Sequence, residues 1–106
     1  MTTDQFNELS TQMDQLTVDT LIAKAKEYAA DGDRLHNFKV AAKMEGCNLI
    51  QALGGMMAKH TVSIYDMIGS GEFYDESLWA EKIKDHINYL YLLWAAIHED
   101  LIQSEV

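Results

Sequence analysis

The stretch from Ser77 to Leu101 constrains the fold more than any other part of the sequence. Its apolar residues recur in alternating four- and three-residue steps, at Ile83, Ile87, Leu90, Trp94, Ile97 and Leu101. This spacing predicts one continuous helix with a buried apolar stripe. At about 100° per residue, Glu81, Asp85 and Asn88 fall on nearly the opposite side, which continues into Leu92 and Ala96. We therefore predict a central helix that needs cover on both sides and whose acidic row faces an internal cleft.

The rest of the chain is predicted to be helical as well. Proline is absent, and the six glycines are the only strong helix breakers in 106 residues. Thr3 or Asp4 is expected to cap a short helix that ends near Leu16, so that residues 1–16 form an N-terminal arm. Thr17 is expected to cap a second helix that ends at the turn 31–33. These patterns predict an all-α, single-domain bundle of about four to five helices, with residues 17–101 as its core.

Two further helices are expected before the last one. A short helix ends at Gly46, with apolar positions at Val40, Ala41 and Met44. Asn48 caps the next helix, which runs to about residue 67. Its core-facing stripe consists of Leu49, Leu53, Met56, His60, Ile64 and Met67. Asp75 or Ser77 is expected to cap the last helix.

Charge and composition restrict the function. A formal net charge of −9 excludes general nucleic-acid binding, because an acidic protein repels phosphate backbones and the eight Lys and Arg residues form no basic face. No apolar run approaches the roughly 20 residues of a membrane-spanning helix, and the first residues are acidic where a signal peptide would be basic. The single cysteine, Cys47, fits a reducing compartment. We expect a cytoplasmic protein without membrane or direct nucleic-acid contacts. Two kinds of partner remain possible. One is a small anionic ligand held through a divalent cation, and the other is a basic protein.

The acidic row of the last helix is the first candidate site. Glu81 and Asp85 are one turn apart and can jointly hold Mg²⁺, which prefers oxygen ligands and usually keeps water and substrate phosphates. Asn88 extends the row. A solvated helix face is the alternative, but the row continues into apolar residues and so points toward the bundle, where unpaired carboxylates are costly.

A second candidate strip lies on the preceding helix, where Gly55, Lys59, Ser63 and Asp66 share one side. Lys59 can meet a phosphate there, and Asp66 can supply a further metal ligand. The alternative is an exposed Lys-Asp face. His60 lies on the apolar stripe and is expected to be a hydrogen-bonded core histidine.

Several segments resemble a known family. The segment EKIKDHINYLYLL at 81–93 resembles the acidic helix of the MazG-like all-α nucleoside triphosphate pyrophosphohydrolases, whose acidic residues bind Mg²⁺. The segments HNF at 36–38, GMMAKHTVSIYDM at 55–67 and WAEKIKDHINYLYLL at 79–93 are similar to small phage and prophage proteins of the nucleotide-modification-associated group. The resemblance covers roughly residues 20–100.

The resemblance implies a MazG-like nucleotide-binding protein of phage origin. Its specific reaction is the Mg²⁺-dependent hydrolysis of a nucleoside triphosphate to a monophosphate and pyrophosphate. Asp85 matches the superfamily aspartate and Glu81 is the nearest acid to its glutamate, whose own position holds Lys82. In this interpretation Glu81 and Asp85 are catalytic and bind the metal with Asp66, while Lys59, Lys82 and Asn88 bind the substrate.

Three alternatives remain. The chain can bind a nucleotide without hydrolysing it. It can also be a non-enzymatic, acidic helical interaction protein, such as a phage inhibitor of a host defence or nucleic-acid-processing protein, because a net charge of −9 suits a basic host partner. A structural helical oligomer is the third possibility. Since the last helix needs cover on both sides and the chain is short, we also predict a homo-oligomer, a dimer or a tetramer.

Overall fold

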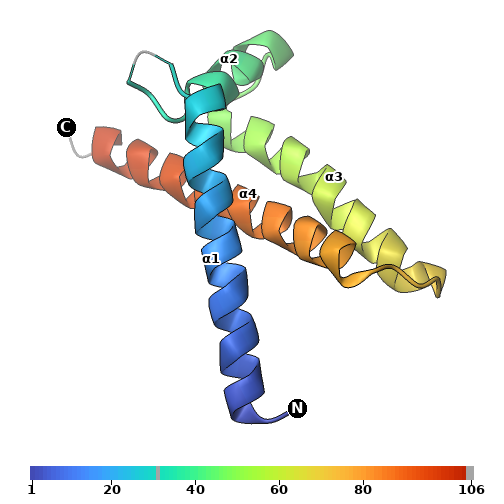
Figure 1. Cartoon of the computed structure of the whole chain (residues 1–106). Coiled ribbons are helices and arrows are strands. Elements are labelled where there is room, and N and C mark those ends of the chain that lie inside the picture. Colours follow the sequence, from blue (N-terminus) through green and yellow to red (C-terminus); the bar gives the residue numbers. More distant parts are fainter. Residues whose placement is uncertain (31, 105–106) are drawn as a thin grey trace.

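Four helices account for most of residues 1–30 and 32–104, the part of the chain that the computed structural model describes (Figure 1). They are α1 (Thr3–Tyr28), α2 (His36–Glu45), α3 (Leu49–Ser70) and α4 (Glu76–Ser104). A short loop joins α3 and α4 into a hairpin, α1 crosses α4, and α2 lies between the C-terminal end of α1 and the start of α3. The predicted all-α fold with a long last helix is confirmed.

The first helix is continuous, so the predicted break between Leu16 and Thr17 is wrong. α1 begins with a capping box, in which Thr2 accepts a hydrogen bond from the backbone N–H of Gln5 and the Gln5 side chain accepts one from Thr2. Thr17 lies buried in the middle of the helix, and its hydroxyl donates to the carbonyl oxygen of Met13 at 2.7 Å. A threonine whose hydroxyl is satisfied one turn back can stay inside a helix. Its preference for helix starts therefore gave a false boundary.

Three other helix ends follow the predicted capping residues, whereas α1 is capped by Thr2 and not by Thr3 or Asp4 as predicted. Gly46 ends α2 with a positive φ of 69°, a conformation that costs glycine little. Asn48 forms a capping box with Gln51 at the start of α3. Asp75 caps α4, because its carboxylate accepts hydrogen bonds from the Leu78 N–H at 2.9 Å and from a serine hydroxyl. These bonds hold the pKa of Asp75 below its usual value.

Helix α2 buries a different face from the predicted one. Phe38 and Ala42 are buried, whereas Val40 and Met44 are exposed. Both pairs have i, i+4 spacing, so each forms a stripe and the two stripes lie on opposite sides of the helix. The Phe38 ring enters the central cluster of buried apolar residues, which also contains Leu35, Leu53 and Ala96. With Phe38 and Ala42 facing this cluster, Val40 and Met44 necessarily lie on the solvent side.

The last helix reverses one part of the sequence prediction. The side that continues the acidic row is buried, since Asn88 is 7% and Ala96 0% exposed. The apolar stripe predicted to be buried is largely open: Ile83, Leu90 and Trp94 are 39%, 48% and 64% exposed. α3 and α1 pack against α4, and the buried cluster that contains Ala96 also contains Leu53 of α3 and Phe38 of α2. No helix among the described residues covers the opposite side of α4.

Helix α2 is fastened by an ion-pair network of Asp33, Lys39 and Glu99. The Lys39 Nζ lies 2.7 Å from Asp33 Oδ2 and 2.6 Å from Glu99 Oε1, which connects α2 to the preceding turn and to α4. Asp33 also accepts a hydrogen bond from the Leu35 N–H at 2.9 Å. The hydrogen bonds from Lys39 and Leu35 hold the pKa of Asp33 below its usual value, and the two carboxylates raise the pKa of Lys39.

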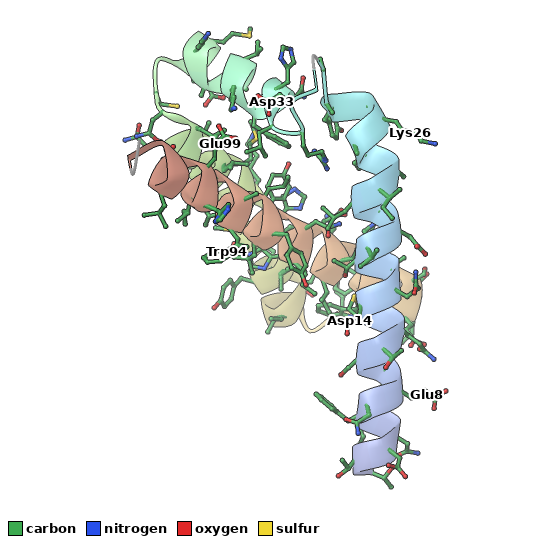
Figure 2. The ribbon with its side chains drawn as sticks, turned by 90° about the vertical axis from the view of Figure 1, so that its left-hand side faces the viewer. Glu8, Asp14, Lys26, Asp33, Trp94 and Glu99 are labelled. Carbon is green, nitrogen blue, oxygen red and sulfur yellow. The ribbon has the colours of Figure 1, made fainter. Side chains whose placement is uncertain are left out.

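The N-terminal part of α1 extends away from the rest of the molecule (Figure 2). Phe6 and Leu9 are exposed there, although they belong to the helix face that farther along buries Thr17 and partly buries Met13. Figure 2 shows Glu8 on this arm, well beyond the crossing with α4. The predicted arm therefore exists as the first turns of a longer helix and not as a separate short helix.

Candidate functional site

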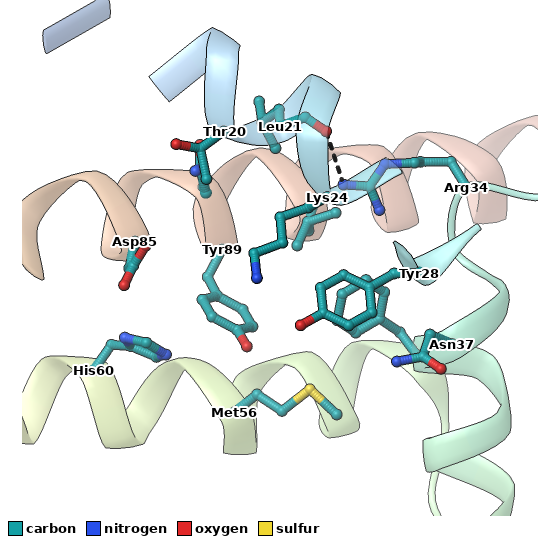
Figure 3. Close-up of a pocket in the computed structure, with 13 residues that line it drawn as sticks. Thr20, Leu21, Lys24, Tyr28, Arg34, Asn37, Met56, His60, Asp85 and Tyr89 are labelled. Atoms are coloured by element: carbon teal, nitrogen blue, oxygen red, sulfur yellow. Dashed lines mark hydrogen bonds between the residues drawn. The ribbon is translucent and has the colours of Figure 1, made fainter. Parts of the chain in front are cut away.

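A pocket of about 320 Å³ lies over the middle of α4, with α1 on one side, α3 on another and the α1–α2 turn with α2 closing one end (Figure 3). This volume is at the lower end of the range for small-molecule pockets. The α4 residues that line it are Asp85, Asn88, Tyr89 and Leu92. They belong to the side of α4 that the sequence predicted to face an internal cleft, so that the predicted cleft is present for Asp85 and Asn88.

Two cationic side chains reach the pocket from outside the hairpin. Lys24 lies on α1, with its Nζ 5.3 Å from the centre of the Tyr28 ring and 3.4 Å from a Glu27 carboxylate oxygen. Tyr28 and then Glu27 raise the pKa of Lys24, so the ammonium stays charged at neutral pH. Arg34 lies in the α1–α2 turn and donates from Nη2 to the Leu21 carbonyl oxygen at 3.4 Å. The pocket thus has a positive side (Figure 3).

Two polar atoms at this pocket are buried without a hydrogen-bond partner among the described residues: Arg34 Nη1 and Asn88 Oδ1. An unpaired buried polar group costs about 1–3 kcal/mol, and native proteins contain few of them. The first atom is a donor and the second an acceptor, yet they belong to different elements and do not meet each other. Both residues line the same pocket, from which a ligand or ordered water can supply the missing partners.

Aromatic rings form much of the remaining wall. The Tyr28 and Phe38 rings have centroids 6.2 Å apart, and the His60 and Tyr89 rings lie 4.7 Å apart at an interplanar angle of 38°. Burial raises the pKa of Tyr89, so its hydroxyl stays protonated and able to donate. His60 is partly buried and contacts Tyr89, which agrees with the predicted core position. Both pairs are tilted contacts between neighbouring rings and leave no gap between them, so a flat heterocycle can only lie against one ring face.

Asp85 is the one carboxylate among the residues that line this pocket. Its side chain is half-buried and lies 3.3 Å from Lys84 Nζ. Figure 3 shows Asp85 close to His60 at one end of the pocket and Arg34 at the other, with Lys24 between them. The two ends of the pocket therefore carry opposite charges, with a carboxylate at one end and a guanidinium at the other.

The other predicted site residues lie elsewhere. Glu81, Lys59 and Asp66 are exposed, Lys82 is half-buried, and none of the four is a lining residue of the pocket. Sequence reasoning missed Lys24, Arg34 and Asn37, which line it. A signal was present for one of them, because Lys24 and Tyr28 are one turn apart on the face of α1 that meets α4. Helical periodicity could not predict that Lys24 lies at the same pocket as Arg34 or Asn88, because these residues belong to other elements.

Among the described residues, the pocket does not contain the ligand set of an independent metal centre. In the described part of the chain, no three His, Cys, Asp or Glu side chains come together as a metal-binding group. The pocket offers the Asp85 carboxylate and the unpaired Asn88 amide oxygen, one turn apart on α4. Mg²⁺ is often held by one or two protein oxygens, with water and substrate phosphates completing its octahedral shell. Of the two groups, the half-buried Asp85 carboxylate is the one that can join such a shell from the pocket without a rearrangement of a buried atom.

Comparisons of the chain with protein-family models, with curated proteins and with solved structures give no match. Among the described helices, none combines the length and the apolar character that crossing a membrane requires.

Proposed function

We propose that this chain is a MazG-like, phage-type nucleotide-binding protein, and that its specific reaction is the Mg²⁺-dependent hydrolysis of a nucleoside triphosphate to a monophosphate and pyrophosphate. The observation that carries the proposal is the pair of buried, unpaired atoms, Arg34 Nη1 and Asn88 Oδ1, on one pocket that also holds Lys24 and Asp85. A nucleotide supplies both acceptors for the guanidinium and donors for the amide oxygen. The resemblance of residues 81–93 to the acidic helix of the pyrophosphohydrolases supports the same assignment.

The two ends of the pocket suggest how a nucleotide lies in it. The base lies against the Tyr28 ring, where Arg34 and Asn37 can read its edge or its sugar. The phosphates extend toward Asp85, and Lys24 reaches them from the middle of the pocket (Figure 3). In a net acidic protein this lysine provides the positive charge that an anionic ligand needs on entering.

The residues of the chain have distinct roles in this reaction. Mg²⁺, when bound, neutralises phosphate charge and lowers the pKa of an attacking water. Asp85 is the predicted ligand that lines the pocket, with Glu81 and Asp66 as predicted ligands that lie outside the pocket of a single chain. Lys24 offsets the charge that develops on the leaving pyrophosphate, a role predicted from sequence for Lys59 and Lys82.

The proposal is tested by thermal shift of the purified protein against a panel of ribo- and deoxynucleoside triphosphates, with and without Mg²⁺, followed by pyrophosphate release for each hit. A ligand at about 100 times its dissociation constant stabilises the native state by about 2.7 kcal/mol, a shift of several degrees. We expect at least one triphosphate to stabilise the protein, more strongly with Mg²⁺ than without it.

Matched variants locate the response. Lys24→Met is expected to abolish the shift, whereas Lys26→Met is expected to preserve it, because Lys26 is exposed on the same helix outside the pocket. Asp85→Asn is expected to remove the Mg²⁺ dependence and the pyrophosphate release. If no triphosphate stabilises the wild-type protein with Mg²⁺, the proposal fails. If one binds in the pocket without release of pyrophosphate, the chain is a nucleotide-binding protein and not an enzyme.

The alternative function, an acidic inhibitor of a basic host protein, rests on the net charge of −9. It predicts no nucleotide response and no effect of Lys24→Met. A cytoplasmic setting belongs to either proposal, since both nucleotide triphosphates and host nucleic-acid-processing proteins occur there and the lone Cys47 is a free thiol.

A further inference from the structure

The outer face of α4 carries large apolar side chains that nothing in the described part of the chain covers. Leu90, Tyr91 and Trp94 are 48%, 52% and 64% exposed, and Ile83 adds to the same face about two turns before Leu90. Figure 2 shows Trp94 and Glu99 on different sides of α4, with Glu99 toward the α2 ion-pair network and Trp94 away from it. Contiguous exposed apolar surface of this kind marks an interaction site.

The same face is free of charge over its whole length. From Trp79 to His98, every Asp, Glu, Lys and Arg of α4 lies on a flank or on the pocket side of the helix at about 100° per residue. A basic partner would meet no acidic side chain here, so charge attraction does not explain this surface. The face suits an apolar partner, and an uncharged strip is also where two chains of net charge −9 can approach with least repulsion.

The apolar stripe of α4 has nearly the same spacing in both directions from Leu90, so it can pack against an antiparallel copy of itself. Ile83 and Ile97 each lie seven residues from Leu90, and Ile87 and Trp94 lie three and four residues from it. A two-fold interface requires that one patch match its own copy, with residue i opposite residue j and j opposite i. An antiparallel pair of α4 helices centred on Leu90 meets this condition, because Ile83 then packs near Ile97 of the second copy.

The charges on one flank of α4 fit the same arrangement. Lys82 and Asp100 are eighteen residues apart and so lie at the same angle around the helix, about five turns from each other. Neither is in an ion pair within the described residues. In an antiparallel two-fold pair the same flanks adjoin, which brings Lys82 of one copy close to Asp100 of the other, twice by symmetry.

We propose that the partner of this face is a second copy of the chain, with the two α4 helices packed antiparallel around Leu90. Lys82 then serves the interface, which gives a reason for a lysine at the position where the resembled family has a glutamate. The stripe is about 30 Å long at 1.5 Å rise per residue, and a contact of one helix pair lies at the small end of specific interfaces. We therefore expect a concentration-dependent dimer with a micromolar dissociation constant. This inference does not depend on nucleotide binding.

Sedimentation velocity across micromolar concentrations tests the interface. The wild type is expected to shift from monomer to dimer, and Leu90→Glu is expected to stay monomeric. Val62→Glu is the matched control: Val62 is equally open to solvent but lies on α3, so this variant is expected to dimerise as the wild type does. Helix content by circular dichroism confirms that both variants fold. A wild type that is monomeric throughout, or a Leu90→Glu variant that still dimerises, overturns the proposal.

Two further experiments test the orientation. Lys82→Glu is expected to weaken the dimer, and the double variant Lys82→Glu with Asp100→Lys is expected to restore it. In a Cys47→Ser background, oxidation is expected to cross-link Leu90→Cys with itself, because this position lies at the two-fold axis. Ile83→Cys is expected not to cross-link with itself, since an antiparallel pair places it at opposite ends. Efficient self-linking of Ile83→Cys means a parallel pair and overturns the antiparallel arrangement.

Discussion

Replacing Asn88 by leucine separates the stability of the fold from the binding of a ligand. Asn88 is 7% exposed, and its Oδ1 has no hydrogen-bond partner in the described part of the chain. Leucine has a similar branched shape without the polar atoms, so Asn88→Leu removes the desolvation cost of an unpaired buried oxygen, about 1–3 kcal/mol. Any excess volume of leucine can enter the adjacent pocket.

The expected result is a more stable protein that no longer responds to its ligand. For a domain of this size, 1 kcal/mol corresponds to about 4–8 °C in Tm, so Asn88→Leu is expected to melt at least about 4 °C above the wild type. The nucleotide-dependent shift is expected to disappear, because the amide oxygen that the ligand would satisfy is gone. Stability gained together with function lost is typical of residues kept for binding.

Differential scanning calorimetry and thermal shift with Mg²⁺ and a triphosphate measure both effects. Asn37→Leu is the control, because Asn37 also lines the pocket but is exposed, and its Tm is expected to change by less than the equivalent of about 0.5 kcal/mol. A lower Tm for Asn88→Leu would mean that the amide stabilises the free protein, and the reasoning from the unpaired oxygen would be refuted. A nucleotide shift that survives in Asn88→Leu would remove Asn88 from the site.

Three further predictions concern the fold. Leu53 is 1% exposed in the central cluster, so Leu53→Ala is expected to lower the free energy of unfolding by about 2–5 kcal/mol, measured by urea denaturation. The pKa of Asp33 is lower in the folded state than in the unfolded one, so its ion pair with Lys39 stabilises the protein above the unfolded pKa of about 3.9 and this contribution is lost as the pH falls through the folded pKa. Because both side chains are about one-third exposed, the loss is expected to be about 0.2–1 kcal/mol and to be absent from Asp33→Asn in denaturation series at pH 2 to 6. Thr2→Ala is expected to increase hydrogen exchange in the first turns of α1 while Tm stays nearly constant, since the arm contacts little of the body; a large fall in Tm would show that the arm is covered in solution.

The positions where helices end were predictable because the interactions that end them are local. Asn48, Gly46 and Asp75 act on backbone groups within a few residues of themselves, through a side-chain cap or a positive φ. Thr17 is the instructive exception. Its hydroxyl has a second local solution, a bond to the carbonyl of Met13, and burial against α4 selected that one. A residue that prefers the N-cap position therefore marks a helix start only where tertiary packing does not favour more helix in front of it.

The candidate site was predictable on α4 but not beyond it. Asp85 and Asn88 share one side of one helix, and helical geometry alone brings them together. Lys24 and Arg34 reach the same pocket from α1 and from the turn after it, at a distance in sequence that no periodicity spans. Glu81, one turn before Asp85, shares much of the same angular sector and still stays outside, because the pocket is bounded by where α1 and α3 cross α4.

The sequence by itself determined that this chain is helical, where three of its helices begin or end, and that α4 is a helix with two faces in need of cover. Only the tertiary structure decided which of those faces became the core. Both were compatible with burial, and the choice fell to the side of Ala96, which is fully buried in one cluster with Leu53 and Phe38. Local patterns fix what a helix can bury, whereas the contacts between distant helices fix what it does bury. The face left open by that choice, with Leu90 and Trp94 at its centre, is the one that we assign to a second copy of the chain.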